Sequence, residues 1–445
     1  MNRGFYIIMA AQFFSALADN ALLIASIALL RDMHAPEQYE PLLKLFFTVS
    51  YVVLAAFVGA LADSRPKGRV MFFSNGVKIL GCFTLLFSTV PSLQFIGAPD
   101  YVYPLLAYAI VGLGAAAYSP AKYGILTEYL PHNKLVIANS WIEGLTVGAI
   151  ILGTVLGGLL INPTVSNFLL SVDLPLIETS IDTGPEVAIL VISSVYFVAA
   201  LFNIYVPKTK VDHKVLHKNP LYLIHDFVHS LKLLWRDKLG QISLAVTTLF
   251  WGAGATLQFI VLKWADTALD MDLDKATILQ GVVAVGVAIG AVLAARLIAL
   301  DKAIKVLKIG IAMGLVVMSM VFVTSLPVAL IMMVVVGAMS GFFVVPMNAL
   351  LQHRGHILMG AGHSIAVQNF NENVSILIML GVYSLLIYLD LSIYIIVVIF
   401  GSFVSITMIA VALWHRHNMK HYGEELKMML RVAQTESLET TEKSK

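Results

Sequence analysis

Ionisable side chains inside long apolar runs are the residues of this chain whose types point to chemistry. Asp19, Lys122, Glu143 and Glu372 each lie within such a run, and Lys263 lies near the end of another. A charge at bilayer depth costs at least about 2.5–3.5 kcal/mol on insertion scales, so such residues usually face a cavity or a charged partner. We interpret them as the lining of a polar pathway. The alternative is purely structural contact, with Asp19 paired to Lys122 or Glu143 held by a neighbouring helix.

The composition tells us what kind of element must position these residues. Of the 445 residues, 59% are hydrophobic and 13% are charged, against roughly 45–50% and about 25% in average soluble domains. The net charge of +2 gives no field that would favour nucleic acid. Cys82 is the single cysteine, which excludes internal disulfides and thiolate metal clusters. We therefore predict an integral membrane protein without a metal or cofactor.

Apolar runs of crossing length predict about twelve transmembrane helices, each needing about 20 residues. The predicted spans are 5–30, 43–62, 70–90, 102–126, 135–161, 187–206, 240–264, 276–299, 303–325, 327–351, 361–389 and 391–414. The first run carries Asp19 and Asn20 in its middle and ends without a small-residue cleavage site, so we expect a retained helix rather than a signal peptide.

The distribution of positive charge predicts the orientation of these spans. Of the 29 lysines and arginines, 23 fall on the side of the N-terminus, 4 lie on the opposite side and 2 lie inside spans. Because positively charged loops stay in the cytoplasm, both termini are predicted to be cytoplasmic.

The connection 207–239 is the longest one on that side and divides the chain near its middle. Apolar residues recur in it at helical spacing, which predicts an amphipathic helix that either lies on the inner leaflet or packs on the bundle. We assign 1–206 to an N-terminal six-helix bundle, 240–416 to a C-terminal one and 417–445 to a polar cytoplasmic tail, whose end we expect to be disordered.

A faint internal repeat supports two related halves. Pro120 and Pro346 follow small-residue stretches and are 226 residues apart, while Glu143 and Glu372 each follow an aromatic residue by two positions and are 229 residues apart. Two parallel repeats of six spans are the architecture of the major facilitator superfamily. The sequence therefore predicts an all-α membrane protein made of two six-helix bundles.

The loop 59–69 resembles the major-facilitator pattern of glycine, aspartate and a basic-glycine-arginine cluster, although its Gly68 and Arg69 lie two residues further from Asp63 than usual. In that family such residues form a charge relay that latches the cytoplasmic ends of helices. The resemblance implies a gating role for Asp63, Arg65 and Arg69. The alternative is a short basic loop that only obeys the positive-inside rule.

A narrower resemblance covers residues 5–414. The stretches 11–23, 118–126, 250–254, 341–346 and 366–369 resemble the bacterial lysophospholipid transporter family, with Ser-Pro-Ala-Lys-Tyr-Gly at 119–124 as the most specific part. The resemblance implies movement of lysophosphatidylethanolamine and related lysolipids to the cytoplasmic leaflet of the inner membrane, where a separate acyltransferase and acyl-acyl carrier protein synthetase re-esterifies them. Gln258 departs from the family, which has a basic residue near that position.

A lysolipid headgroup would use both kinds of charge in the predicted pathway. Its phosphate suits Lys122 or Lys263, and its ammonium suits Asp19, Glu143 or Glu372. The predicted binding residues are Asp19, Asn20, Lys122, Tyr123, Glu143, Gln258, Lys263, Gln368, Asn369 and Glu372.

Three other classes were weighed against this prediction. The chain has no Gly-Lys pair and hence no phosphate loop of an ATP-driven pump, and no His-x4-Asp pattern of a glycerolipid acyltransferase. A drug or small-metabolite exporter of the same superfamily remains the main alternative, and an integral-membrane lipid enzyme is a weaker one. The sequence leaves open whether sodium or protons drive transport.

Overall fold

The computed structural model describes residues 3–88, 99–129, 135–171, 181–207, 219–298, 300–359 and 361–442. These residues form helices and no strand, and twelve helical segments are long and apolar enough to cross a membrane. The prediction of an all-α membrane protein with about twelve crossings is therefore confirmed.

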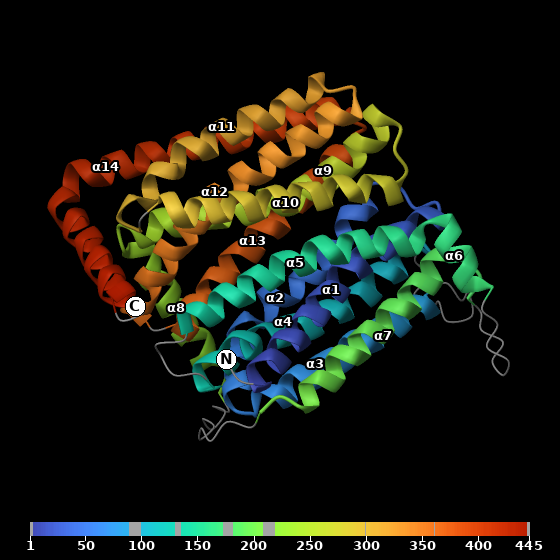
Figure 1. Cartoon of the computed structure of the whole chain (residues 1–445), viewed down its shortest axis with the longest axis horizontal. Coiled ribbons are helices and arrows are strands. Elements are labelled where there is room, and N and C mark those ends of the chain that lie inside the picture. The colour runs from blue at the N-terminus through green and yellow to red at the C-terminus, as the bar shows by residue number, and fades with distance from the viewer. Residues whose placement is uncertain are drawn as a thin grey trace. The chain divides into compact units, whose positions relative to one another are not determined.

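The chain divides into two compact units. Unit 1 comprises Met1–Lys218, Asp270–Gly281 and Leu380–Asp390. Its helices are α1 (Arg3–Asp32), α2 (Tyr39–Asp63), α3 (Lys67–Phe87), α4 (Val102–Tyr129), α5 (Leu135–Ile161), α6 (Pro163–Leu170) and α7 (Gly184–Ile204). Within it α1 packs between α5 and α7, and α3 packs against α4 and α7 (Figure 1).

Unit 2 comprises Asn219–Leu269, Val282–Met379 and Leu391–Lys445. Its elements are α8 (Pro220–Arg236), α9 (Gly240–Leu269), α10 (Leu273–Leu297), η3 (Leu300–Val306), α11 (Leu307–Met318), η4 (Ser319–Phe322), α12 (Leu326–Met359), α13 (Ala361–Tyr388) and α14 (Ile393–Glu442). The first turns of α10 and the last turns of α13 belong to unit 1. Within unit 2, α9 contacts α12 and α14, and α11 packs along α14.

Helix interiors contain both prolines of the predicted repeat. Pro120 lies inside α4 and Pro346 lies inside α12. A proline removes one backbone hydrogen bond from its helix and clashes with the preceding turn, so each position is a site where the helix can bend. The two prolines thus occupy similar positions in helices of different units.

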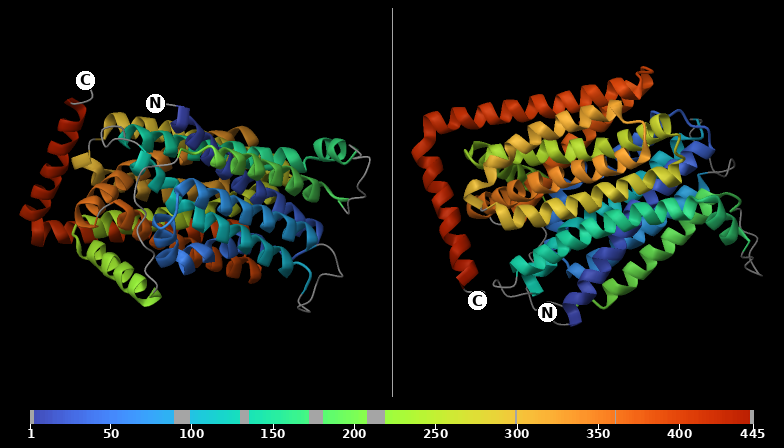
Figure 2. Two further views of the ribbon diagram at one scale, coloured as in Figure 1. Left: turned by 90° about the horizontal axis from the view of Figure 1, so that it is seen from below. Right: turned by 45° about the horizontal axis from the view of Figure 1, so that its top comes forward.

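The linker helix and the tail differ in how well they were predicted. The amphipathic helix expected within 207–239 is confirmed as α8. The expectation that the end of the tail is disordered differs from the structure, in which α14 continues to Glu442, with non-helical backbone angles at Tyr422 where it turns sharply (Figure 2). Glutamate, leucine, lysine and methionine dominate the first turns beyond Tyr422, and all are good helix formers. The domain boundaries 1–206, 207–239, 240–416 and 417–445 stay predictions.

Candidate functional site

Asp19 in unit 1 is held by a lysine that lies inside another span. The Lys78 Nζ atom of α3 is 2.8 Å from both Asp19 Oδ1 and Asp19 Oδ2. It also donates to Ser15 Oγ at 3.0 Å, and the Tyr196 hydroxyl of α7 donates to Asp19 Oδ1 at 2.6 Å. The cation beside Asp19 is therefore Lys78, not Lys122 as one interpretation of the sequence had it.

The surroundings of Lys78 suit a fixed charge. Its Nζ lies 5.1 Å from the centre of the Tyr118 ring and 5.3 Å from that of Tyr196, within the range of cation–π attraction. Helix α4 approaches α3 closely here because Gly114 of α4 has no side chain. A Cβ at that position would lie 2.6 Å from the Ser74 carbonyl oxygen and 2.8 Å from Lys78 Cγ.

The two members of the pair differ in access. The Lys78 side chain is 1% exposed, whereas that of Asp19 is 22% exposed. Two hydrogen bonds from the ammonium to the two oxygens of one carboxylate fix the direction of that carboxylate. The arrangement therefore places a partly accessible carboxylate beside a buried countercharge that offsets much of its charge.

Lys122 lies on α4, two residues beyond Pro120. Its Nζ donates to Thr146 Oγ1 of α5 at 2.8 Å and lies 5.1 Å from the centre of the Tyr123 ring. Gln12 Nε2 donates to the Lys122 carbonyl oxygen at 3.1 Å, which ties α1 to α4. Lys122 and Tyr123 are both partly buried. The lysine is thus a cation inside a span, held by hydroxyl and aromatic neighbours.

The structure says less about the binding roles of two further predicted residues of unit 1. The amide of Asn20 donates to the Ala16 carbonyl oxygen of its own helix at 2.8 Å. Glu143 belongs to α5, but its side chain lies outside the described residues.

A second polar cluster lies in unit 2 between α12 and α13. Gln368 Nε2 donates to Asn348 Oδ1 at 2.6 Å and to Glu372 Oε1 at 2.8 Å. Gln368 is 5% exposed and Glu372 is 8% exposed. The predicted polar face of this span is confirmed in that its glutamine and glutamate contact each other, and Asn348 joins them from the neighbouring helix.

The other predicted residues of unit 2 lie on α9 and α13. The Asn369 carbonyl oxygen accepts a bond of 2.7 Å from Asn373 Nδ2. Lys263 Nζ lies 3.9 Å from Asp266 Oδ2, and its side chain is 27% exposed. Gln258 is partly buried on α9. Their roles in binding stay predictions.

The predicted gating residues lie at the turn between α2 and α3. Arg65 and Arg69 are exposed, and the Asp63 side chain lies outside the described residues. Between the arginines, Lys67 is 2% exposed and donates to the Ala62 carbonyl oxygen at 2.8 Å. The charge relay stays a prediction, and the buried lysine of this loop is one that the pattern did not single out.

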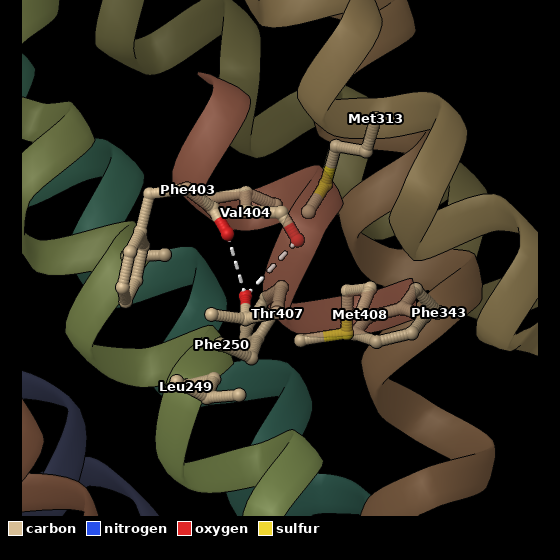
Figure 3. Close-up of a pocket in the computed structure, with 9 residues that line it drawn as sticks. Leu249, Phe250, Met313, Phe343, Phe403, Val404, Thr407 and Met408 are labelled. Carbon is tan, nitrogen blue, oxygen red and sulfur yellow. Dashed lines mark hydrogen bonds between the residues drawn. The ribbon is translucent and has the colours of Figure 1, made fainter. Parts of the chain in front are cut away.

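A small apolar pocket of unit 2, with an empty volume of about 240 Å³, lies among α9, α11, α12 and α14 (Figure 3). Its lining comprises Leu249, Phe250, Ala253, Met313, Phe343, Phe403, Val404, Thr407 and Met408. The Thr407 hydroxyl turns away to the Phe403 and Val404 carbonyl oxygens at 2.7 and 3.1 Å. The lining of the pocket is therefore apolar.

Sequence reasoning missed Lys78 and Tyr196 as members of the site. Lys78 is one of two lysines inside predicted spans, so its depth was evident, but its partner was not. Asn348 was missed because an asparagine near the end of an apolar run carries no distinctive spacing. In the described part of the chain, no group of three or more His, Cys, Asp or Glu side chains could hold a metal ion.

Comparison with known proteins identifies relatives of this arrangement. The sequence pattern described as Major Facilitator Superfamily matches residues 8–378. A protein of Escherichia coli (strain K12) named lysophospholipid transporter LplT is 38% identical over 418 residues, which are 94% of this chain and 97% of that protein. The protein of the same name from Shigella boydii serotype 4 has the same identity and coverage.

Two solved structures share the fold at low sequence identity. An auto-inhibited peptide transporter of the POT family has a TM-score of 0.65 and 12% identity, covering 93% of this chain and 97% of its own. A mutant of the nucleoside transporter NupG has a TM-score of 0.67 and 10% identity, covering 92% of this chain and 100% of its own.

Proposed function

The chain belongs to the major facilitator superfamily, and we propose that it is a secondary transporter that moves lysophospholipids across a membrane. Relatives that carry this function in their names cover nearly the whole chain. The observation that carries the proposal within the molecule is the presence of a buried or half-buried carboxylate in each unit, Asp19 and Glu372, at apolar depth.

The headgroup chemistry matches these charges. A lysophosphatidylethanolamine headgroup carries a phosphate and an ammonium, and its transfer through hydrocarbon would strip both of their hydration. Fixed opposite charges inside spans replace that solvation and lower the barrier. We assign the ammonium to Asp19 or Glu372, and the phosphate to Lys122, a partly buried lysine inside a span.

The remaining predicted binding residues take supporting roles in this proposal. They are Asn20, Tyr123, Glu143, Gln258, Lys263, Gln368 and Asn369. Gln368 orients the Glu372 carboxylate directly, through a bond of 2.8 Å. The acyl chain stays against the apolar surface of the helices, because it forms no hydrogen bonds with the polar clusters and because its burial releases water.

The finer parts of the proposal concern place and direction. The protein lies in the bacterial inner membrane with both termini in the cytoplasm, and it moves lysolipids inward to the leaflet where a separate acyltransferase and acyl-acyl carrier protein synthetase re-esterifies them. The chain itself acts as a transporter and not as an enzyme. Asp63, Arg65 and Arg69 gate the pathway at one membrane surface.

Transport in vesicles tests the proposal. Purified protein is reconstituted, labelled lysophosphatidylethanolamine is added to the outer leaflet, and the fraction that albumin can no longer extract is followed over time. We expect protein-dependent movement of the lipid. Lys122→Ala should abolish it, because the site then lacks its positive charge. Lys122→Arg should keep part of it, because the charge remains but the planar guanidinium differs in shape from the ammonium.

Lys275→Gln is the matched control, since Lys275 is 61% exposed and paired within one turn to Asp272. It should transport at the parental rate. Vesicles that move a soluble drug but leave lysophosphatidylethanolamine in its original leaflet would overturn the proposal and favour an exporter.

A further inference from the structure

Helix α8 is attached to unit 2 along one face only. On that face Leu234 is fully buried in a cluster with Leu244 of α9. The Phe227 ring lies 5.2 Å from the Phe370 ring of α13, edge to face. These contacts confirm the packing that the sequence left open, and they leave the opposite face of α8 without a described partner cluster.

Two polar contacts to α13 flank that face, one on each side. Trp235 Nε1 donates to Asn371 Oδ1 at 3.2 Å, and Asp226 Oδ2 lies 3.0 Å from His363 Nε2. Asp226 is the one acidic residue within α8. The acidic side chain of the helix thus lies at the border of the packed face, 48% exposed and beside His363, and the outer stripe carries no carboxylate of its own.

The outer face changes character along the helix axis. Toward its beginning lie Leu221, Ile224 and Val228, which are 72%, 41% and 36% exposed. Toward its end lie Lys232 and Arg236, both exposed. Leu221, Val228 and Lys232 follow the i, i+7, i+11 spacing of a single helical stripe. The outer face therefore presents apolar side chains first, with the exposed His225 and His229 among them, and permanent positive charges last.

The position of α8 in the chain sets its depth. It ends at Arg236, and the membrane-spanning helix α9 begins at Gly240. Three residues separate the two helices, so the Cα atoms of Arg236 and Gly240 are at most about 14 Å apart, which keeps the end of α8 near the membrane surface where α9 begins. Apolar side chains at this depth partition between headgroups, and lysine and arginine bind lipid phosphates there.

We propose that α8 is a lipid-binding element whose outer face lies on the anionic headgroups of the membrane surface where α9 begins. Leu221, Ile224 and Val228 reach between the lipids, and Lys232 and Arg236 bind their phosphates. The occupant is anionic lipid because the charges of the face are all positive and its apolar part adjoins them.

The contact reaches the candidate site through one helix. Asn371, the acceptor of the Trp235 hydrogen bond, immediately precedes Glu372 on α13. The lipid held by α8 therefore stabilises the placement of α13 through the Phe227 and Trp235 contacts. This consequence goes beyond the proposed function and does not depend on which molecule is transported.

Spin-label accessibility tests the proposal in the full-length protein. In a Cys82→Ser background, single cysteines at Leu221 and Val228 carry a nitroxide, and collision rates with oxygen and with a nickel chelate are measured in vesicles. Ile406, 64% exposed within α14, gives the lipid reference. Glu424, whose side chain is 92% exposed, gives the water reference. We expect an oxygen-to-nickel ratio at both α8 sites several-fold above that at Glu424.

The charges are tested separately. In phosphatidylglycerol vesicles, Lys232→Gln with Arg236→Gln should move the α8 labels toward water, whereas Lys275→Gln with Lys427→Gln removes two exposed charges and should not. In neutral phosphatidylcholine vesicles, Lys232→Gln with Arg236→Gln should change the accessibility of the α8 labels little. The proposal is overturned if the α8 labels are as accessible to the nickel chelate as the label at Glu424. It is also overturned if the α8 labels are shielded from both reagents in lipid-free detergent, because a protein partner would then cover this face.

Discussion

At the scale of single residues, burial separates the Asp19–Lys78 pair, at 22% and 1% exposure, from the exposed pairs of the described residues. Lys427 and Glu424 also lie 2.9 Å apart, but their side chains are 56% and 92% exposed. An exposed pair of this kind contributes roughly 0–1 kcal/mol, because water and salt screen it. Breaking a buried pair costs about 3–5 kcal/mol, since one charge is left without compensation.

Lys78→Met should therefore destabilise the protein by about 3–5 kcal/mol and abolish lysolipid transport. Thermal unfolding in detergent measures the first effect and vesicle transport the second. Lys427→Gln is the control and should change neither.

A reversed pair separates structural from functional roles. Asp19→Lys combined with Lys78→Asp keeps opposite charges in contact and should recover much of the lost stability. It places a cation where Asp19 faces open space, so transport of a lipid with an ammonium headgroup should stay absent. Recovery of transport in this double variant would mean that the pair is only structural.

Glu372→Gln tests the second cluster at the same scale. The substitution keeps the size of the side chain and its contact with Gln368, but it removes the charge. We expect the protein to fold and insert normally while the transport rate falls at least about tenfold, the equivalent of roughly 1.4 kcal/mol. Glu424→Gln, at an exposed position, is the matched control. Parental transport by Glu372→Gln would remove this residue from the pathway.

The sequence identified these residues by depth but could not pair them. An ionisable side chain in a run of about 20 apolar residues is visible in any sequence. Whether Asp19 faces Lys78 or Lys122 depends on the rotation of α1, α3 and α4 about their axes. Packing between the helices sets that rotation. The sequence of a helix that is apolar on all sides has no periodic pattern from which the rotation could be predicted.

At the scale of elements, the close approach of α3 and α4 explains why Lys78 can be buried. Gly114→Ala places a methyl group 2.6 Å from the Ser74 carbonyl oxygen, which is backbone and cannot move aside alone. Overpacking of this kind costs about 1–3 kcal/mol. We expect a lower unfolding temperature and reduced transport, because the substitution also meets Lys78 Cγ at 2.8 Å.

Gly76 on α3 provides the control for this prediction. A Cβ there meets no atom within 4 Å. Gly76→Ala should be neutral or stabilising by about 0.5–1 kcal/mol, because alanine loses less backbone freedom in a helix. Equal effects of the two substitutions would show that helix propensity, not the α3–α4 contact, decides the result.

The elements themselves were the best predicted level of the structure. Span lengths follow from bilayer thickness, so apolar runs located twelve crossings to within a few residues at most ends. The end of the polar tail beyond Trp414 was expected to be disordered because of its polarity alone, whereas α14 continues through it to Glu442. Its Glu424–Lys427 pair and its buried Leu426 give it the features of a helix.

At the scale of the whole molecule, the pattern of charge predicts how the chain is threaded through the membrane. The turns that contain Asp100, Asp272 and Asp390 alternate along the chain with the basic connections around Arg65 and Lys302. Asp390 adopts a left-handed backbone angle of 53° in its tight turn. Short turns with few positive charges are those that cross to the far side during insertion.

Single cysteines in the Cys82→Ser background test this threading. Cysteines at Asp100, Asp272 and Asp390 should react with an impermeant maleimide added to intact cells after the outer membrane is made permeable. Cysteines at Arg65, Lys302 and Glu424 should react only after the inner membrane is opened, because the positive-inside rule holds their connections in the cytoplasm. Asp272 and Glu424 form the sharpest comparison, since both side chains are more than 80% exposed, at 82% and 92%. Equal labelling of the two in intact inner membranes would refute the predicted orientation, and with it the inward direction of lipid movement that we propose.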